Sequence, residues 1–184
     1  LSDHEEIRLN KALTKRDAKL ISDRKNGNEW RKKRNLILLP DMENCTYADH
    51  LTPMTLLTLN TGLRRGEMFD LMWKDINLKS KTLTIQGKTA KSGDTRHIPL
   101  NKNVLNVLTY WKKQTSNNGL IFPNKNGERF HTIKTSWRNL LDTAKITDFR
   151  WHDLRHDFAS KLVMEGVPLN TVRELLGHSD IKTT

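Results

Sequence analysis

Residues 151–160, Trp-His-Asp-Leu-Arg-His-Asp-Phe-Ala-Ser, constrain the fold more than any other stretch of the chain. Helical spacing would place His152, Arg155 and His156 on one stripe of a helix. The apolar residues of a neighbouring stripe, which a core can bury, are Leu154, Phe158 and Leu162. A guanidinium fork matches phosphate oxygens, and an imidazole exchanges protons near neutral pH. The stretch therefore predicts a helix that handles a phosphate group, although a solvated helix face can carry the same spacing by chance.

A second arginine is expected at a sharp junction between two helices. Residues 51–59 predict a buried helix that stops at Asn-Thr-Gly, a C-terminal glycine signal, and another helix follows residues 63–67, Leu-Arg-Arg-Gly-Glu. Backbone on both sides would hold Arg64 and aim it inward, and Glu67 could steady it. The alternatives are that Arg64 only caps the preceding helix, or that its neighbour Arg65 is the arginine that points inward.

A basic hairpin and a terminating glycine add further candidates. Residues 82–86 and 95–100 alternate as strands do, and residues 87–94 form a basic tip from which Lys88 or Lys91 could reach a ligand. A helix that begins near residue 169 stops at Gly177, so His178 directly after it is fixed in direction. The simpler interpretations are a solvated tip lysine and a histidine that favours the helix macrodipole.

The charge balance narrows the class of partner. The 184 residues are enough for one domain with a sizeable core, and 32 lysines and arginines against 21 acidic residues leave a net charge of +11. Such an excess suits nucleic acid or an anionic membrane surface. No apolar run is long enough to span a bilayer and no basic amphipathic helix stands out, so nucleic acid is favoured. The lone Cys45 fits a reducing cytosol and excludes a cysteine-rich zinc module.

The remaining pattern predicts a mostly helical α+β fold with a small antiparallel hairpin or three-stranded sheet at one edge. Ser2 and Glu5 form a capping box that begins a first helix, and a second helix is expected over about residues 28–38. Residues 1–50 are thus leading helices, and residues 51–184 carry the candidate site of a single catalytic domain.

The candidate residues together suit one kind of chemistry. The lack of a carboxylate cluster argues against a two-metal nuclease, and no glycine-rich phosphate loop is present. Metal-free phosphoryl transfer on a diester fits better. The charge on the non-bridging oxygens would meet the forks of Arg64 and Arg155, and a lysine or histidine would protonate the leaving oxygen. No metal or other cofactor is expected.

Three short boxes resemble those of a known family. Thr-Gly-Leu-Arg-Arg-Gly-Glu at 61–67, His-Asp-Leu-Arg-His-Asp-Phe-Ala at 152–159 and Leu-Leu-Gly-His at 175–178 look like boxes of the tyrosine recombinases, the phage integrase family. Each box alone is weak, but all of them in this order, with a basic hairpin between the first two, are specific. The resemblance covers the chain from about residue 51 to its end and implies a site-specific DNA recombinase, or integrase, that cuts and rejoins DNA through a 3′-phosphotyrosine intermediate.

The resemblance also implies roles for particular residues. By resemblance, the catalytic residues are Arg64, Lys91, His152, Arg155 and His178. The arginines and His178 would bind the scissile phosphate, Lys91 would protonate the leaving 5′ oxygen, and His152 would help with proton transfer. Glu67 would support the first arginine, and Lys88 is the alternative to Lys91.

The expected nucleophile does not match either tyrosine of the chain. Tyr47 and Tyr110 lie in the wrong regions, so the nucleophile is expected shortly beyond Thr184, and a DNA-clamping domain is expected before Leu1. The fragment should therefore bind DNA weakly and not cleave it. By resemblance, the intact protein is a tetramer on paired double-stranded DNA attachment sites in a bacterial cytoplasm, at the nucleoid, with accessory DNA-bending proteins possible and no membrane partner.

Two other functions compete with this interpretation. Residues 165–179 can be read as a helix-turn-helix of a non-catalytic DNA-binding regulator, with residues 170–176 as the recognition helix. His152, His156 and His178 could instead hold a metal for hydrolysis, but carboxylate partners are lacking.

Overall fold

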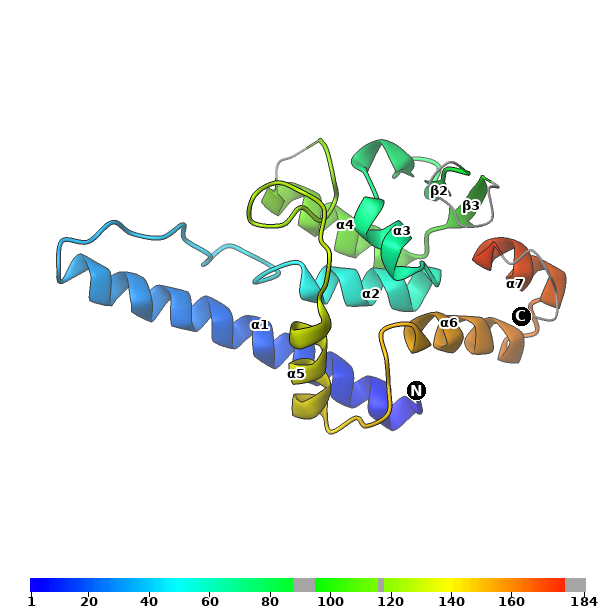
Figure 1. The fold of residues 1–184 in the computed structure, drawn as a ribbon, viewed down its shortest axis with the longest axis horizontal. Coiled ribbons are helices and arrows are strands. Elements are labelled where there is room, and N and C mark those ends of the chain that lie inside the picture. The colour runs from blue at the N-terminus through cyan, green and yellow to red at the C-terminus, as the bar shows by residue number, and fades with distance from the viewer. Residues whose placement is uncertain (88–94, 116–117, 178–184) are drawn as a thin grey trace. The chain divides into compact units, whose positions relative to one another are not determined.

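The computed structural model describes residues 1–87, 95–115 and 118–177 (Figure 1). The chain divides into two compact units. The first unit contains Leu1–Pro53 and Lys134–Asp148, and the second contains Met54–Ile133 and Phe149–Thr184. No helix in the described part of the chain combines the length and apolar character needed to cross a bilayer.

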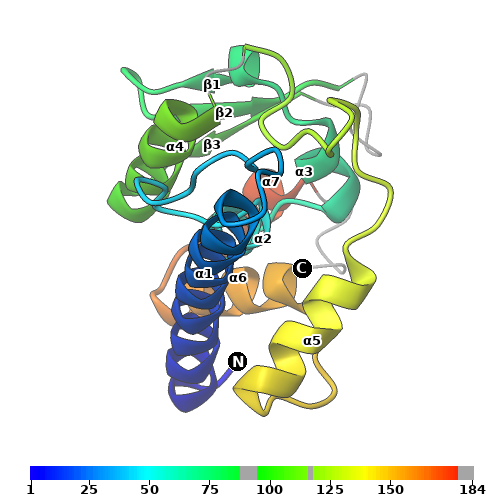
Figure 2. The ribbon, with the colours of Figure 1, turned by 90° about the vertical axis from the view of Figure 1, so that its left-hand side faces the viewer.

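The first unit is built on two helices, α1 (Asp3–Lys32) and α5 (Lys134–Ala144), which pack side by side (Figures 1 and 2). The buried apolar residues between and around them include Leu9, Ala12, Leu13, Trp137, Leu140 and Leu141. The predicted capping box is confirmed, because Ser2 Oγ accepts from the Glu5 N–H at 3.3 Å and Glu5 Oε2 accepts from the Ser2 N–H at 2.9 Å. Helix α1 therefore begins where the sequence indicates.

The predicted second helix over residues 28–38 is wrong. Helix α1 runs without a break through Gly27 to Lys32, and the chain after Asn35 is not helical. Gly27 faces open space, and the helix continues through it without a break. The Asn28 side chain then bonds the N–H and the carbonyl of Leu39, both at 2.9 Å, and this satisfies the backbone of an extended segment beside the helix.

The second unit contains a three-stranded antiparallel sheet in the order β1 (Ile76–Asn77), β2 (Thr82–Ile85) and β3 (Arg96–Pro99), shown in Figure 2. In β2 and β3, Leu83 pairs with Ile98, and Ile85 pairs with Arg96. These four residues are all buried. A short 3₁₀ turn η1 (Trp73–Asp75) precedes the sheet, and α4 (Lys102–Thr115) follows it. The predicted class, mostly helical with a small sheet, is confirmed.

The candidate residues lie on the other helices of this unit. The bounds of these helices are α2 (Leu51–Thr61), which begins in the first unit, α3 (Arg65–Asp70), α6 (Asp153–Met164) and α7 (Leu169–Leu176). Helix α7 contacts both α6 and β3. The two predicted glycine stops are confirmed: Gly62 follows α2 with φ +62° and Gly177 follows α7 with φ +65°. These stops set the directions in which the chain enters and leaves the candidate site.

Candidate functional site

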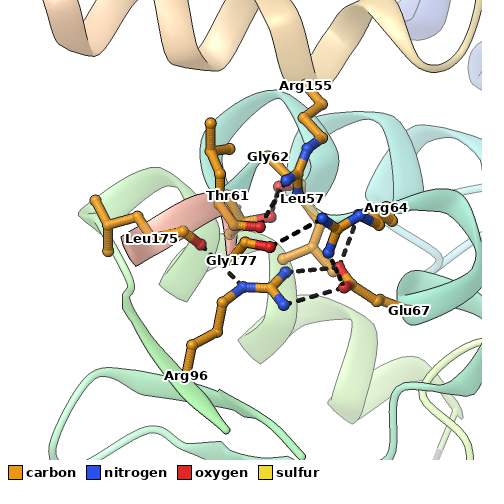
Figure 3. A network of polar contacts seen from close by, with 10 residues as sticks. Leu57, Thr61, Gly62, Arg64, Glu67, Arg96, Arg155, Leu175 and Gly177 are labelled. Carbon is orange, nitrogen blue, oxygen red and sulfur yellow. Dashed lines mark hydrogen bonds and ion pairs between the residues drawn. The ribbon is translucent and has the colours of Figure 1, made fainter. Parts of the chain in front are cut away.

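The junction between α2 and α3 aims one arginine at the end of α7. An added Cβ at Gly62 would lie 2.5 Å from Phe158 and 2.8 Å from Leu176, so only glycine fits this left-handed turn. Arg64 follows in an extended conformation as the N-cap of α3. Its Nη2 donates to the Gly177 carbonyl at 3.0 Å (Figure 3). Arg65 is exposed, so Arg64 is the arginine of the pair that points inward.

The second predicted arginine reaches the same place from α6. The Nη1 of Arg155 donates to the Gly62 carbonyl at 2.8 Å, and its Nη2 donates to the Leu176 carbonyl at 2.6 Å. The side chain is 3% exposed. Burial, and then the nearby Arg64, lower the pKa of Arg155 to about 9. The two arginines therefore converge on consecutive carbonyls, at Leu176 and Gly177.

The prediction that His152, Arg155 and His156 share one face holds for the two histidines and is wrong for Arg155. His152 is the N-cap of α6 rather than a residue within it, and Arg155 is buried while both histidines are exposed. The imidazole rings contact each other edge to face, with centroids 5.0 Å apart. Burial, followed by the neighbouring His156 and Arg155, lowers the pKa of His152. The Arg155 guanidinium points inward because the carbonyls at the ends of α2 and α7 accept its hydrogen bonds. Residues 151–160 alone do not reveal these partners.

Glu67 is the acceptor at the centre of the site. Its Oε1 accepts from Arg64 Nη1 at 2.9 Å, and its Oε2 accepts from the Arg64 N–H at 2.9 Å. The predicted support of Arg64 by Glu67 is therefore present as contacts. Burial by itself raises the pKa of Glu67, but bonds from Arg96 and Arg64 outweigh it and hold that pKa below its usual value. The carboxylate is thus ionised and fully engaged.

Arg96 is a site residue that the sequence analysis missed. It lies on β3, is 7% exposed, and donates to both oxygens of Glu67, at 3.0 Å from Nη1 and 2.6 Å from Nη2. A signal was present, because Arg96 shares the inward parity of Ile98 and Leu100 on an alternating strand. An arginine at a core position needs a carboxylate partner.

We call Arg64, Arg96 and Arg155 the arginine cluster. Figure 3 shows their guanidinium groups converging around the Glu67 carboxylate and the last carbonyls of α7. With these groups charged, the cluster exceeds the single carboxylate by two positive charges. Carbonyl oxygens satisfy donors but carry only partial charge, so a tetrahedral oxyanion would be a favourable additional partner.

The other predicted residues cannot be placed in this way. Lys91, its alternative Lys88 and His178 lie outside the described residues. The described ranges contain no group of three or more histidine, cysteine or acidic side chains arranged to hold a metal ion. What the described geometry brings together is the Arg64, Glu67 and Arg155 of the prediction, together with Arg96.

Comparison with known proteins identifies a family that covers most of the chain. The sequence profile of the phage integrase family matches residues 36–184. The chain is 34% identical over 136 residues to the integrase of Salmonella phage P22, which covers 67% of this chain and 35% of that protein. It is 33% identical over 137 residues to the tyrosine recombinase XerA of Pyrococcus furiosus, which covers 71% of this chain and 47% of that protein. The chain thus spans between about a third and a half of the length of these relatives.

Solved structures show the same fold. The crystal structure of a XerA recombinase matches with a TM-score of 0.62 at 19% identity, over 87% of this chain and 66% of that one. The XerH site-specific recombinase bound to its difH substrate, in a pre-cleavage complex, matches with a TM-score of 0.62 at 25% identity, over 71% of this chain and 40% of that one.

Proposed function

Because the chain belongs to the phage integrase family, we propose that it is the catalytic part of a site-specific tyrosine recombinase that cuts and rejoins double-stranded DNA. The observation that carries this proposal is the convergence of Arg64 and Arg155 on adjacent carbonyls at the end of α7. A guanidinium has more N–H donors than the described partners of either arginine use, and the remaining ones can bind the non-bridging oxygens of a phosphodiester.

The proposed reaction needs no metal. A tyrosine oxygen attacks the phosphorus, the bond from phosphorus to the 5′ oxygen breaks, and the protein becomes linked to the 3′ phosphate. The arginine forks stabilise the charge that develops on the phosphate, and Lys91 gives its proton to the leaving 5′ oxygen. His152 assists proton transfer and His178 binds the phosphate. Attack by a 5′ hydroxyl of a second strand reverses the step and joins the strands.

The nucleophile and the wider assembly belong to the same proposal. Tyr47 is buried in the first unit and Tyr110 lies half-exposed on α4, so we assign the nucleophile to a tyrosine that is not among the 184 residues. The partners are paired DNA attachment sites, a tetramer of the protein and, depending on the system, DNA-bending proteins, in a cytoplasm next to the nucleoid. One catalytic domain, accompanied by a separate DNA-clamping domain, would act in each subunit.

The helix-turn-helix alternative is less well supported. A recognition helix must expose the side chains that read bases. In α7, Val172 and Leu176 are buried, and the carbonyls of the helix end accept bonds from the arginine cluster. Footprinting separates the two functions, since a regulator would protect a palindromic operator and leave both strands intact.

The test of the proposal uses the full-length protein and a suicide DNA substrate, whose nicked strand is lost after cleavage so that the covalent product accumulates. We expect a covalent protein–DNA complex that forms in the presence of a chelator and is lost in Arg155→Ala. A wild-type protein that forms no such complex, or one whose product survives Arg155→Ala, would contradict it.

The lysine assignment is tested on the same substrate. Lys91→Ala should slow cleavage, and replacing the leaving 5′ oxygen with sulfur should restore the rate, since sulfur leaves without a proton. A loss that persists with the sulfur substrate would assign the proton transfer elsewhere, and Lys88→Ala is the matched variant for that case.

A further inference from the structure

Arg96 is the member of the arginine cluster that the proposed reaction does not use. All of its guanidinium nitrogens donate to described partners: Nη1 and Nη2 to Glu67, and Nε to the Leu175 carbonyl at 2.9 Å. The paired bonds to one carboxylate form the bidentate geometry in which arginine binds most strongly. Arg96 is therefore occupied by the protein itself, unlike an arginine that is available to a ligand.

The Glu67 carboxylate links Arg96 to Arg64. Each oxygen accepts one bond from each arginine, since Oε1 accepts from Arg64 Nη1 and Arg96 Nη1, and Oε2 accepts from the Arg64 N–H and Arg96 Nη2. This uses the acceptor capacity of a carboxylate almost completely. The position of the Arg64 guanidinium thus depends on a carboxylate whose rotation Arg96 prevents.

The end of α7 is held by the same residues. The consecutive carbonyls of Leu175, Leu176 and Gly177 accept from Arg96, Arg155 and Arg64, respectively. The last carbonyls of a helix lack partners within the helix, and cations there are favoured by the macrodipole. When Arg64 and Arg155 turn donors toward a phosphate, Arg96 remains as the contact that keeps the helix end in place.

Gly177 shows independently how closely Arg96 fits this end. A Cβ added at Gly177 would lie 3.1 Å from both Cδ and Nη1 of Arg96, which is tighter than most contacts in proteins. Any side chain at Gly177 would therefore push on the Arg96 guanidinium. The backbone at Gly177 and the Arg96 side chain are therefore closely packed against each other.

We propose that Arg96 is a positioning residue for DNA strand transfer, which fixes Arg64 through Glu67 and fixes the point where the chain leaves α7. This inference rests on the proposed function. Arg96 does not touch the phosphate in this proposal. It keeps the Arg64 guanidinium and the end of α7 in the positions that phosphate binding requires.

The main test compares Arg96→Lys with Arg129→Lys in the full-length protein. Arg129 also makes a bidentate pair, with Asp70 at the end of α3, but that pair is partly exposed and shares no described hydrogen bond with Glu67 or α7. On the suicide substrate, Arg96→Lys should slow formation of the covalent complex roughly ten- to a hundredfold, since misplacing a catalytic group by about 1 Å has effects of this size. DNA affinity, measured by fluorescence anisotropy, should be retained. Hydrogen exchange over residues 170–177 should become faster, and Arg129→Lys should change none of these readouts.

Coupling to Arg64 separates positioning from a general loss of stability. If Arg96 acts through Glu67 on Arg64, then Arg96→Lys should have a much smaller effect in an Arg64→Lys background than in the wild type. The inference would be overturned if Arg96→Lys slowed cleavage by the same factor in both backgrounds, or if its rate equalled that of the wild type. A wild type that forms no covalent complex would instead contradict the proposed function itself.

A second variant covers the case in which Arg96→Lys does not fold. Gly177→Ala leaves the guanidinium present but pushes on it, and Gly166→Ala is its control, since Gly166 also has a positive φ of +82° but faces open space. Both variants carry the backbone strain, of about 1 kcal/mol. Only Gly177→Ala should slow cleavage and speed exchange at the end of α7, and equal rates in the two variants would overturn the inference.

Discussion

The two units each hold arginine in ion pairs, part-buried in the first unit and more deeply buried in the second, and with opposite charge balance. In the first unit, Arg16 donates to two carboxylates, Asp17 at 3.1 Å and Asp49 at 3.0 Å. In the second unit, Arg64 and Arg96 share the single carboxylate of Glu67, and Arg155 donates to the carbonyls of Gly62 and Leu176. Arg16 is thus neutralised by its own neighbours, whereas the arginine cluster retains charge for an anion.

The helix ends of the two units differ in the same way. Arg8, which is exposed, donates to the carbonyls of Ala144 and Lys145 at 3.0 and 3.2 Å and so caps the end of α5 without help from another arginine in the described contacts. The end of α7 receives the whole arginine cluster. One exposed arginine is enough to satisfy a helix end, so the additional buried guanidinium groups at α7 need a different explanation, which is the phosphate binding proposed above.

The largest expected effect is on stability. Glu67→Ala should lower the free energy of unfolding by about 3–5 kcal/mol, because it leaves buried guanidinium groups unpaired. Asp49→Ala removes a partly exposed pair and a bond to the Leu51 N–H, and should cost about 1–2 kcal/mol. Urea unfolding measures both, and equal losses would remove the difference between the two units.

The contribution of Glu67 to the stability of the folded protein should decrease at acidic pH. The pKa of Glu67 is lowered in the folded protein, so its stabilising contribution is complete above the ordinary glutamate value of 4.5 and is lost as the pH falls through the lowered value. Glu67→Gln should therefore flatten the decline of stability in this acidic range. A decline as steep in Glu67→Gln as in the wild type would assign it to other carboxylates.

The next largest effect is on strand cleavage, which should depend on the arginine cluster and not on Arg16. Arg64→Ala and Arg155→Ala should each slow strand cleavage by about a hundredfold or more, equivalent to about 2.7 kcal/mol, because each removes stabilisation of the phosphate charge. Arg16→Ala should leave the rate close to that of the wild type once the protein is folded. Rates from the suicide substrate measure this, and a near-normal rate in either of the first two variants would refute the role given to that arginine.

Binding of an inorganic anion should have a smaller effect, on the free energy of unfolding. Inorganic sulfate at about ten times its dissociation constant should stabilise the folded protein by about 1.4 kcal/mol, as for any ligand of the native state. Thermal unfolding in sulfate and in chloride of equal ionic strength measures this. Arg155→Ala should abolish the difference and Arg16→Ala should keep it; the reverse result would place the anion in the first unit.

The smallest effect concerns His152 and His50, because the neighbour with the largest electrostatic effect lowers the pKa of the first and raises that of the second. Burial lowers the pKa of both His152 and His50, but His156 and Arg155 lower the first further while Asp49 raises the second. His156→Gln should therefore raise the pKa of His152, and Asp49→Asn should lower that of His50. Titration of the imidazole resonances by NMR measures both, and shifts in the same direction would contradict this electrostatic difference.

The elements that could be predicted are those specified by local chemistry. The capping box at Ser2, the glycine stops at Gly62 and Gly177, and the alternating strands all depend on residues within a few positions of one another. The contact between Arg64 and Glu67 belongs to this group, since it joins residues one helical turn apart. The family resemblance also rests on short boxes, and the family match over residues 36–184 confirms it.

The errors concern interactions between distant segments. The exception is the continuation of α1 through Gly27, where no described segment lies within 4 Å of an added Cβ, so this error concerns local helix propensity. Arg96 was overlooked because its partner Glu67 lies in another element, although its parity on the strand marked it as buried. The inward turn of Arg155 likewise depends on carbonyls at the ends of α2 and α7.

The sequence by itself determined which side chains are available for phosphate chemistry, and at which helix ends and turns they stand, because caps, glycine turns and strand alternation act over a few residues. Only the tertiary structure decided which guanidinium groups are buried, and that they meet at the end of α7. Burial and hydrogen bonding to carbonyls depend on segments far apart in the chain, so the charge balance of the site exists only once those segments are packed together.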